Sequence, residues 1–213
     1  DFTDSTQYDL EASNRFQGYF AEVAYASEWG LDVIAGVRAE HLVIHKTKHQ
    51  GLLPRLTLRF KVLPGTVIKG AFGVYEKLPE PPFLLEGFGN PKLSAERSTH
   101  YIAGFAHAFG DRVDLALQAF YNDKRDLTSA STVTRIENGQ QIREVFNNDG
   151  SGKSYGLEVL LRHLASPGGG FYGGVAYTLS RSLLTDRSSG RFGAEIQSSG
   201  QQDLPLTEYI SPY

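Results

Sequence analysis

Apolar and polar residues alternate one by one through most of this chain, and this period of two constrains the fold more than any other feature. Val113, Leu115 and Leu117 alternate with Asp114 and Gln118. Because successive side chains of a strand point to opposite faces, such a segment predicts a strand with one apolar and one polar face. The same alternation runs through the segments 31–39, 55–62, 67–75, 113–121, 155–162 and 171–179.

Two further segments, 16–28 and 98–109, follow the pattern less cleanly, and no segment shows a sustained helical period. The predicted strands are about 10 to 13 residues long, enough to cross a bilayer core when tilted, whereas strands of soluble proteins usually have roughly 5 or 6 residues. The chain has no run of about 18 apolar residues, which excludes a helical membrane protein. Its 23 Gly, 13 Phe and 11 Tyr with only 40% hydrophobic residues suit a membrane β-barrel, where every second residue is apolar.

Short and long connections alternate between the predicted strands. Tight turns are predicted at 29–30, 63–65, 110–111 and 166–170, and longer links at 46–51, 78–97 and 123–153. Outer-membrane barrels have short periplasmic turns and long extracellular loops. The sequence therefore predicts an all-β fold, an antiparallel up-and-down transmembrane β-barrel with about eight spanning strands in this chain.

The direction of the strands adds an expectation about completeness. With the tight turns on the periplasmic side, the segments 16–28 and 171–183 place both ends of the chain on the loop side. Complete bacterial barrels begin and end at the periplasmic rim. We therefore expect residues 1–213 to form one domain that is part of a larger barrel, without its closing strand.

Composition excludes several classes of function. The chain has 21 Lys+Arg and 24 Asp+Glu, a formal net charge of −3, so general nucleic-acid binding has little electrostatic support. It has no cysteine, which rules out disulfides, thiolate zinc sites and cysteine nucleophiles. We find no Gly-x-Ser-x-Gly elbow and no other catalytic constellation, so we expect neither an enzyme nor a cofactor.

Four motifs follow one another along the chain: PRLTLRF at 54–60 with TVIKGAFGVY at 66–75, GNPKL at 89–93 followed by ERSTHY at 96–101, GKSYGLE at 152–158, and YTLSRS at 177–182. In order and spacing they resemble the carboxy-terminal part of the barrel of TonB-dependent outer-membrane receptors. The family's plug domain, energy-coupling box and closing strand have no counterpart in residues 1–213.

The resemblance implies active uptake across the bacterial outer membrane. Receptors of this family bind a scarce nutrient, such as an iron chelate, a cobalamin or an oligosaccharide, within a ring of loops. TonB then pulls on the plug to let the nutrient pass. Membrane lipid, the nutrient and TonB, acting through the plug, are thus the expected partners, and this chain would supply barrel wall and extracellular loops.

The polar face of the strands supplies the candidate site residues. We expect eight residues to face the lumen: Arg38, Glu40, Arg55, Arg59, Lys69, Tyr75, Glu158 and Arg162. Three aromatic residues of the long links are candidates for ligand contact: Phe83, Phe88 and Phe146. The alternatives are that the charges are solvated or paired for structural reasons and that the aromatics pack the loops together.

Two patterns suggest a metal without strong support. The segment 147–158, NNDGSG followed by Glu158, has the oxygen ligands of a calcium loop, but no helices flank it. His41, His45 and His49 are four residues apart, a spacing that forms a metal-binding face only on a helix. A phosphate loop is dismissed at GSGKS (150–154), because position 147 is Asn rather than Gly. We predict no metal site.

Three other classes of protein share the alternating pattern. A passive porin-like barrel would have no plug, and an outer-membrane barrel enzyme would need a catalytic cluster at one rim. A soluble β-sandwich or ligand-binding barrel would turn the apolar faces inward. Alternation by itself does not distinguish inside from outside, so the apolar residues Leu58, Leu115 and Val159 could meet in a dry core or face lipid.

Overall fold

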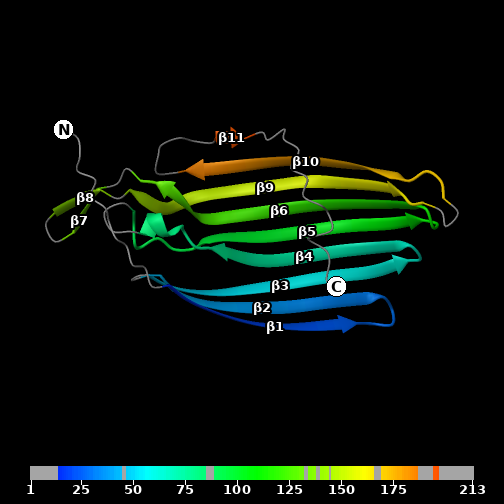
Figure 1. Cartoon of the computed structure of the whole chain (residues 1–213), viewed down its shortest axis with the longest axis horizontal. Helices are drawn as coiled ribbons and strands as arrows, with labels where there is room; N and C mark the ends of the chain where they lie inside the picture. The colour runs from blue at the N-terminus through cyan, green and yellow to red at the C-terminus, as the bar shows by residue number, and fades with distance from the viewer. Residues whose placement is uncertain are drawn as a thin grey trace.

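The described residues of this computed structural model are 14–44, 47–84, 89–131, 134–137, 140–143, 145–165, 169–186 and 194–196. Most of them belong to long strands (Figure 1): β1 (Asn14–Ala26), β2 (Leu31–Ile44), β3 (Thr47–Leu63), β4 (Thr66–Lys77), β5 (Glu96–Phe109), β6 (Val113–Ala130), β9 (Phe146–His163) and β10 (Gly173–Asp186). The shorter elements are η1 (Pro81–Leu84), β7 (Thr134–Glu137), β8 (Gln140–Arg143) and β11 (Ala194–Ile196).

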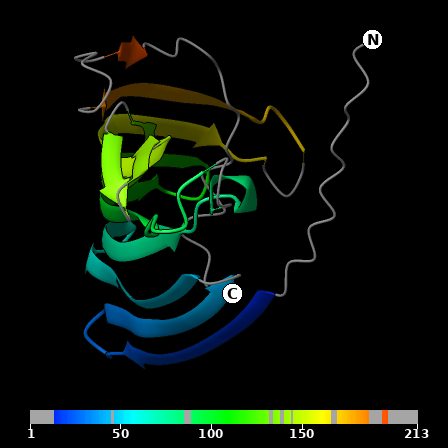
Figure 2. The same ribbon diagram turned by 90° about the vertical axis from the view of Figure 1, so that its left-hand side faces the viewer.

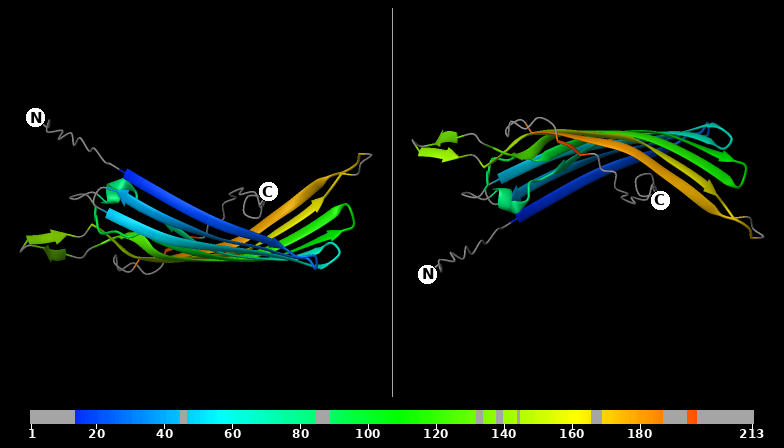
Figure 3. Two further views of the ribbon diagram at one scale, coloured as in Figure 1. Left: turned by 90° about the horizontal axis from the view of Figure 1, so that it is seen from below. Right: turned by 90° about the horizontal axis from the view of Figure 1, so that it is seen from above.

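The strands form one curved antiparallel sheet of nine strands in the order β1-β2-β3-β4-β5-β6-β9-β10-β11. The long strands lie side by side in the order in which they follow one another in the chain, and the separate hairpin β7-β8 is inserted between β6 and β9. Among the described residues β1 and β11 are the two edges, so the sheet is not closed. Figures 2 and 3 show its curvature, with η1 and the neighbouring loop on the concave side.

All eight predicted strands are present, as are the turns near 29–30, 63–65 and 110–111. Two of the predicted long links are wrong, because the strands extend through them. β3 already begins at Thr47, and most of 123–153 consists of β6, the hairpin and β9. β6 and β9 remain paired on both sides of a register shift between Lys124 and Leu127. Asp126, with a φ of 57°, lies at this shift, as expected for a β-bulge.

The apolar face of the sheet is not covered by any other part of the described chain. Leu58 is 39% exposed and Leu157 is 45% exposed, whereas Leu115 and Val159 are half-buried on the same face. The buried apolar residues that the structure describes lie instead around the loop-side strand ends: Leu53, Val74, Leu84, Leu93 and Ala95. A soluble sandwich would require a dry core beneath the apolar face, and the described residues form none.

Aromatic side chains border this apolar face on the loop side. Phe72, Tyr101, Tyr121 and Tyr155 are register partners on β4, β5, β6 and β9, and we call them the upper aromatic row. The rings of Phe72 and Tyr101 are 5.5 Å apart, and those of Tyr101 and Tyr121 are 6.3 Å apart. Aromatic girdles at the two interfaces are typical of membrane barrels.

Near the tight turns, the rings of His107 and Phe109 are 4.3 Å apart on β5. Eight residues separate Tyr101 from Phe109, about 27 Å along the strand and about 20 Å in height for a strand tilted by roughly 40°. This approaches the roughly 25 Å apolar band of outer-membrane barrels. No helix among the described residues has the length and apolar character needed to cross a membrane.

Candidate functional site: the polar face of the sheet

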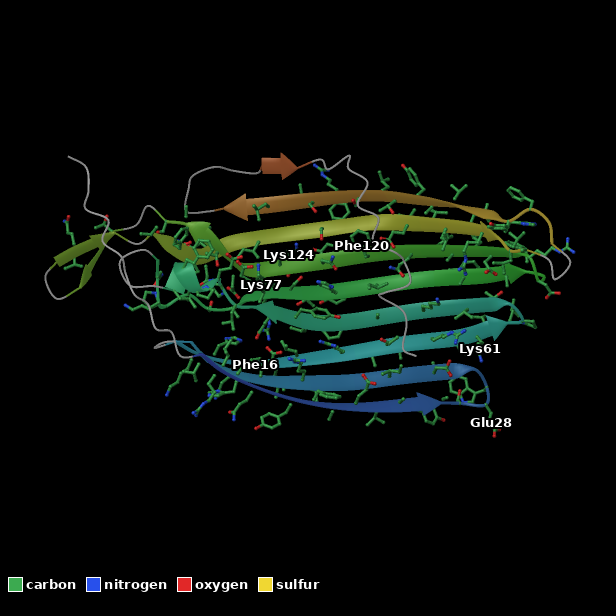
Figure 4. The ribbon with its side chains drawn as sticks, viewed as in Figure 1. Phe16, Glu28, Lys61, Lys77, Phe120 and Lys124 are labelled. Carbon is green, nitrogen blue, oxygen red and sulfur yellow. The ribbon has the colours of Figure 1, made fainter. Side chains whose placement is uncertain are left out.

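The strand registers place the polar residues of neighbouring strands beside one another on the face opposite the upper aromatic row. One register row contains Asp32, Arg59, Lys69, Gly104, Gln118 and Glu158, on six successive strands of the sheet. The eight candidate lumen residues all lie on this face. Figure 4, viewed onto the concave side, shows where Lys61, Lys77 and Lys124 of the same face lie. That the face lines a lumen remains a prediction.

Several charges of the polar face are paired across or along strands. An Arg59 guanidinium nitrogen lies 3.7 Å from an Asp32 carboxylate oxygen. Near the tight turns, Arg162 donates a hydrogen bond of 3.1 Å to Asp114. These pairs are half-exposed, and exposed ion pairs of this kind typically contribute about 0–1 kcal/mol. The alternative of structural pairing therefore describes the Arg59 and Arg162 pairs well.

Other predicted lumen residues also have polar partners. Glu158 accepts a hydrogen bond of 3.4 Å from the side chain of Gln118, and Arg38 forms an ion pair with Glu40 on the same strand. Lys69 is only half-buried. Its register partners are Arg59 and Gly104, so two cations stand side by side on β3 and β4. This part of the face has a local positive charge next to the carboxylate of Asp32.

Nearer the loops, a second register row brings Arg55, Gly73, His100, Asn122 and Ser154 together on five strands, and we call it the Arg55 row. Asn122 donates a hydrogen bond of 3.2 Å to Ser154. The His100 imidazole is 2.8 Å from the Ser98 hydroxyl. The row presents guanidinium, imidazole, amide and hydroxyl groups to whatever fills the concave side.

Tyr75 occupies the gap that Gly73 leaves in this row. The Tyr75 ring is so close that a Cβ on Gly73 would approach it to 2.8 Å, which makes glycine the residue that fits. The Arg55 guanidinium lies 5.3 Å from the Tyr75 ring centroid, and the centroid of the His100 ring lies 4.6 Å from that of Tyr75. The aromatic ring thus joins Arg55 to His100 and holds the cation by a cation–π contact.

The segment after β4 is attached to the loop-side end of β9. The rings of Phe83 and Phe146 are 4.8 Å apart, and the Asn90 side chain donates a hydrogen bond of 2.8 Å to the Phe146 carbonyl. Leu84 and Leu93 are 4% and 2% exposed, so the segment has a small apolar core. These contacts match the alternative in which Phe83 and Phe146 pack loops together. Phe88 lies outside the described residues.

The calcium-loop pattern does not form a loop. Residues 147–158 belong to the extended strand β9, which separates the first and last proposed ligands by roughly 36 Å, so they do not surround one ion. Asn147 instead accepts a hydrogen bond of 2.7 Å from Ser129. His49 contacts the Glu76 carboxylate at 2.9 Å, and His45 lies outside the described residues. No cluster of metal-ligand residues occurs in the described parts of the chain.

Sequence reasoning did not single out His100, Asn122 or Ser154 as site residues. Their partners come from other strands, so their proximity depends on the register and not on spacing in the chain. The sequence did carry one signal: each of them occupies one of the alternate positions of its strand whose side chains point to the polar face. Following the polar positions through 98–109, one residue beyond 113–121 and one residue before 155–162 would have found them.

A curved meander of antiparallel strands, long enough to span a membrane and polar on one face only, defines the wall of a β-barrel of the outer-membrane type. The chain belongs to the family described as TonB dependent receptor-like, beta-barrel, whose model matches residues 1–207. No curated protein matches the sequence significantly.

Solved structures of similar fold include two transporters and a receptor. The FrpB iron transporter from Neisseria meningitidis (F3-3 variant) has a TM-score of 0.65 and 15% identity over 85% of this chain and 27% of that chain. The ferric enterobactin receptor from Pseudomonas aeruginosa has a TM-score of 0.64 and 19% identity over 80% and 30%. The outer membrane transporter YddB from Escherichia coli has a TM-score of 0.62 and 15% identity over 80% of this chain and 25% of that chain. The chain thus spans less than a third of each of these proteins.

Proposed function

We propose that this chain supplies wall and loops to an outer-membrane receptor that takes up a ferric chelate, with TonB as its energy source. The family supports the receptor class. The proteins of similar fold include an iron transporter and a ferric enterobactin receptor, which favours an iron chelate over a cobalamin or an oligosaccharide. In this proposal residues 1–213 form one partial barrel domain, and the plug that TonB pulls belongs to other parts of the full-length protein.

The observation that carries the proposal is the Arg55 row on the concave, polar side of the sheet. Arg55 beside the Tyr75 ring offers hydrogen-bond donors and a positive charge to a ligand rich in oxygen atoms, and the His100 ring next to Tyr75 offers an imidazole N–H. Ferric chelates with carboxylate, catecholate or hydroxamate oxygens have this chemistry, and charge-assisted hydrogen bonds to such oxygens are about twice as strong as neutral ones. The row lies toward the loops, where a ligand would arrive.

The energy source is tested by uptake of a radioactive ferric chelate into cells that carry the full-length protein, with and without TonB. We expect uptake to require TonB. Uptake that continues in cells without TonB would overturn the receptor proposal and favour the passive porin-like alternative.

The binding site is tested with Arg55→Ala in the full-length protein. Because one charge-assisted hydrogen bond is lost, chelate affinity measured by fluorescence quenching should fall about tenfold. Arg162→Ala is the matched control, because Arg162 is a cation of the same face at the opposite strand end. Equal affinities for the two variants would contradict the placement of the ligand at the Arg55 row.

A further inference from the structure

We call the face with the upper aromatic row the outward face. Among the described residues its lysines and arginines lie only toward the loop-side ends of the strands. Six Lys and Arg residues occupy outward positions of the sheet within the described chain, and all six are exposed and lie toward the loop-side strand ends: Arg15, Lys48, Arg97, Arg125, Lys153 and Arg181. The outward strand positions near the tight turns hold His107 and His163 but no Lys or Arg among the described residues. This asymmetry lies on the face opposite the candidate site.

Two of these arginines are held in place by carboxylates that are themselves nearly covered. Arg97 lies 3.3 Å from Glu76, and Arg125 lies 2.7 Å from Asp123. The carboxylate side chains are 11% and 20% exposed, whereas the Arg97 and Arg125 side chains are 48% and 74% exposed. A guanidinium has five N–H donors and these side chains are largely exposed, so pairing with one carboxylate leaves each arginine with further donors.

Below these arginines, a groove of about 430 Å³ crosses the outward face of β3 to β6. Its floor consists of the small residues Gly70, Ala103 and Ala119, which are register partners on β4, β5 and β6. Tyr101 and Tyr121 of the upper aromatic row form its loop-side wall. The groove is lined mainly by apolar side chains of the outward face. Its surface therefore suits an apolar chain and offers a polar ligand few hydrogen-bond partners.

The arginines and the groove lie on opposite sides of the upper aromatic row. Arg125 is four residues from Tyr121 toward the loops, about 10 Å in height at a tilt of about 40°, which is the level of the headgroups. Ala119 is two residues from Tyr121 in the other direction, about 5 Å inside the apolar band. A lipid with its headgroup at Arg97 and Arg125 would therefore place an acyl chain in the groove.

We propose that this surface binds a lipid with a phosphate-bearing headgroup in the leaflet on the loop side. Arg97 and Arg125, with Lys153 beside Asp123, hold the phosphate, and the groove over Gly70 receives an acyl chain. Arginine is suited to this role because its planar fork matches phosphate oxygens in a bidentate fashion. The inference rests on the membrane placement in the proposed function, but not on the transported ligand.

The test uses the full-length protein in nanodiscs of neutral phosphatidylcholine that contain a minor fraction of lipid A, either phosphorylated or dephosphorylated. Retained lipid A per protein is measured by native mass spectrometry. We expect the unmodified protein to prefer the phosphorylated form. The double variant Arg97→Gln/Arg125→Gln should lose roughly 30-fold of that preference, because each basic residue near an anionic headgroup contributes about a factor of five.

The groove is tested with Ala103→Leu/Ala119→Leu, which fills it without changing charge. This variant should retain less lipid A of both forms while keeping the phosphate preference. Arg38→Gln, a cation of the opposite face, is the control and should change neither quantity.

Several results would overturn the proposal. No preference in the unmodified protein, or full preference in the double arginine variant, removes the phosphate site, and unchanged retention in the leucine variant removes the groove. In each of these cases the uptake proposal stands, since the barrel is inserted in the nanodisc. A full-length protein that does not insert as a barrel overturns both proposals.

Discussion

Replacing Leu117 with arginine puts a charge at the middle of the face that we assign to lipid. Leu117 registers with Phe105 and Val159, and it is four residues from Tyr121 in the upper aromatic row and four from Val113 at the strand end. It therefore lies near mid-depth of the apolar band. An arginine at the midplane of an outer-membrane barrel costs about 2–4 kcal/mol, so Leu117→Arg should lower barrel stability by this amount.

The matched control is Gln118→Arg, one residue further along the same strand and on the polar face. Gln118 is 3.4 Å from Glu158, so the new guanidinium gains an ion-pair partner and the change in stability should be below about 1 kcal/mol. Both variants are made in the full-length protein, and urea unfolding in lipid vesicles is followed by the gel shift of folded barrels. Equal stabilities for the two variants, or a greater loss for Gln118→Arg, would refute the assignment of faces.

Two further predictions concern packing on the concave side. Gly156 has Phe120 against it, with ring atoms 2.7 Å from where its Cβ would be, so Gly156→Val should destabilise the barrel by about 1–3 kcal/mol in the same urea assay, and an unchanged midpoint would contradict this packing. Asn90→Ala removes the hydrogen bond to the Phe146 carbonyl and should weaken the attachment of the segment after β4 by about 1 kcal/mol, seen as faster cleavage of that segment by added protease; an unchanged cleavage rate would show that the bond does not hold the segment.

The strands could be predicted from the sequence because each carries its own signal. Leu115 and Leu117 alternate with Asp114 and Gln118 whatever the rest of the chain does, and every predicted strand of this kind is present in the sheet. The extensions of β3 and β6 were missed, since their ends pair through the backbone while their side chains no longer alternate. The bulge near Asp126 hides the continuity of β6 further.

The sequence predicted on which face of the sheet the candidate site residues lie, but not which of them lie next to one another. Alternation assigned Arg55 and Tyr75 to the polar face, where the registers place them. The contact of Tyr75 with His100 depends on which residue of β5 lies opposite Gly73, and single-strand patterns carry no information about register. The docking of Phe83 on Phe146 joins residues far apart in the chain and has no local signal.

The assignment of one face to lipid and the other to water can be measured directly, because the chain contains no cysteine of its own. Single cysteines at successive positions 113–122 of β6, in the full-length protein within lipid vesicles, are spin-labelled and exposed to oxygen, which partitions into lipid, and to a water-soluble nickel chelate. We predict a period of two, with odd positions quenched by oxygen and even positions by nickel. The opposite phase, or nickel access at every position, would contradict the central claim.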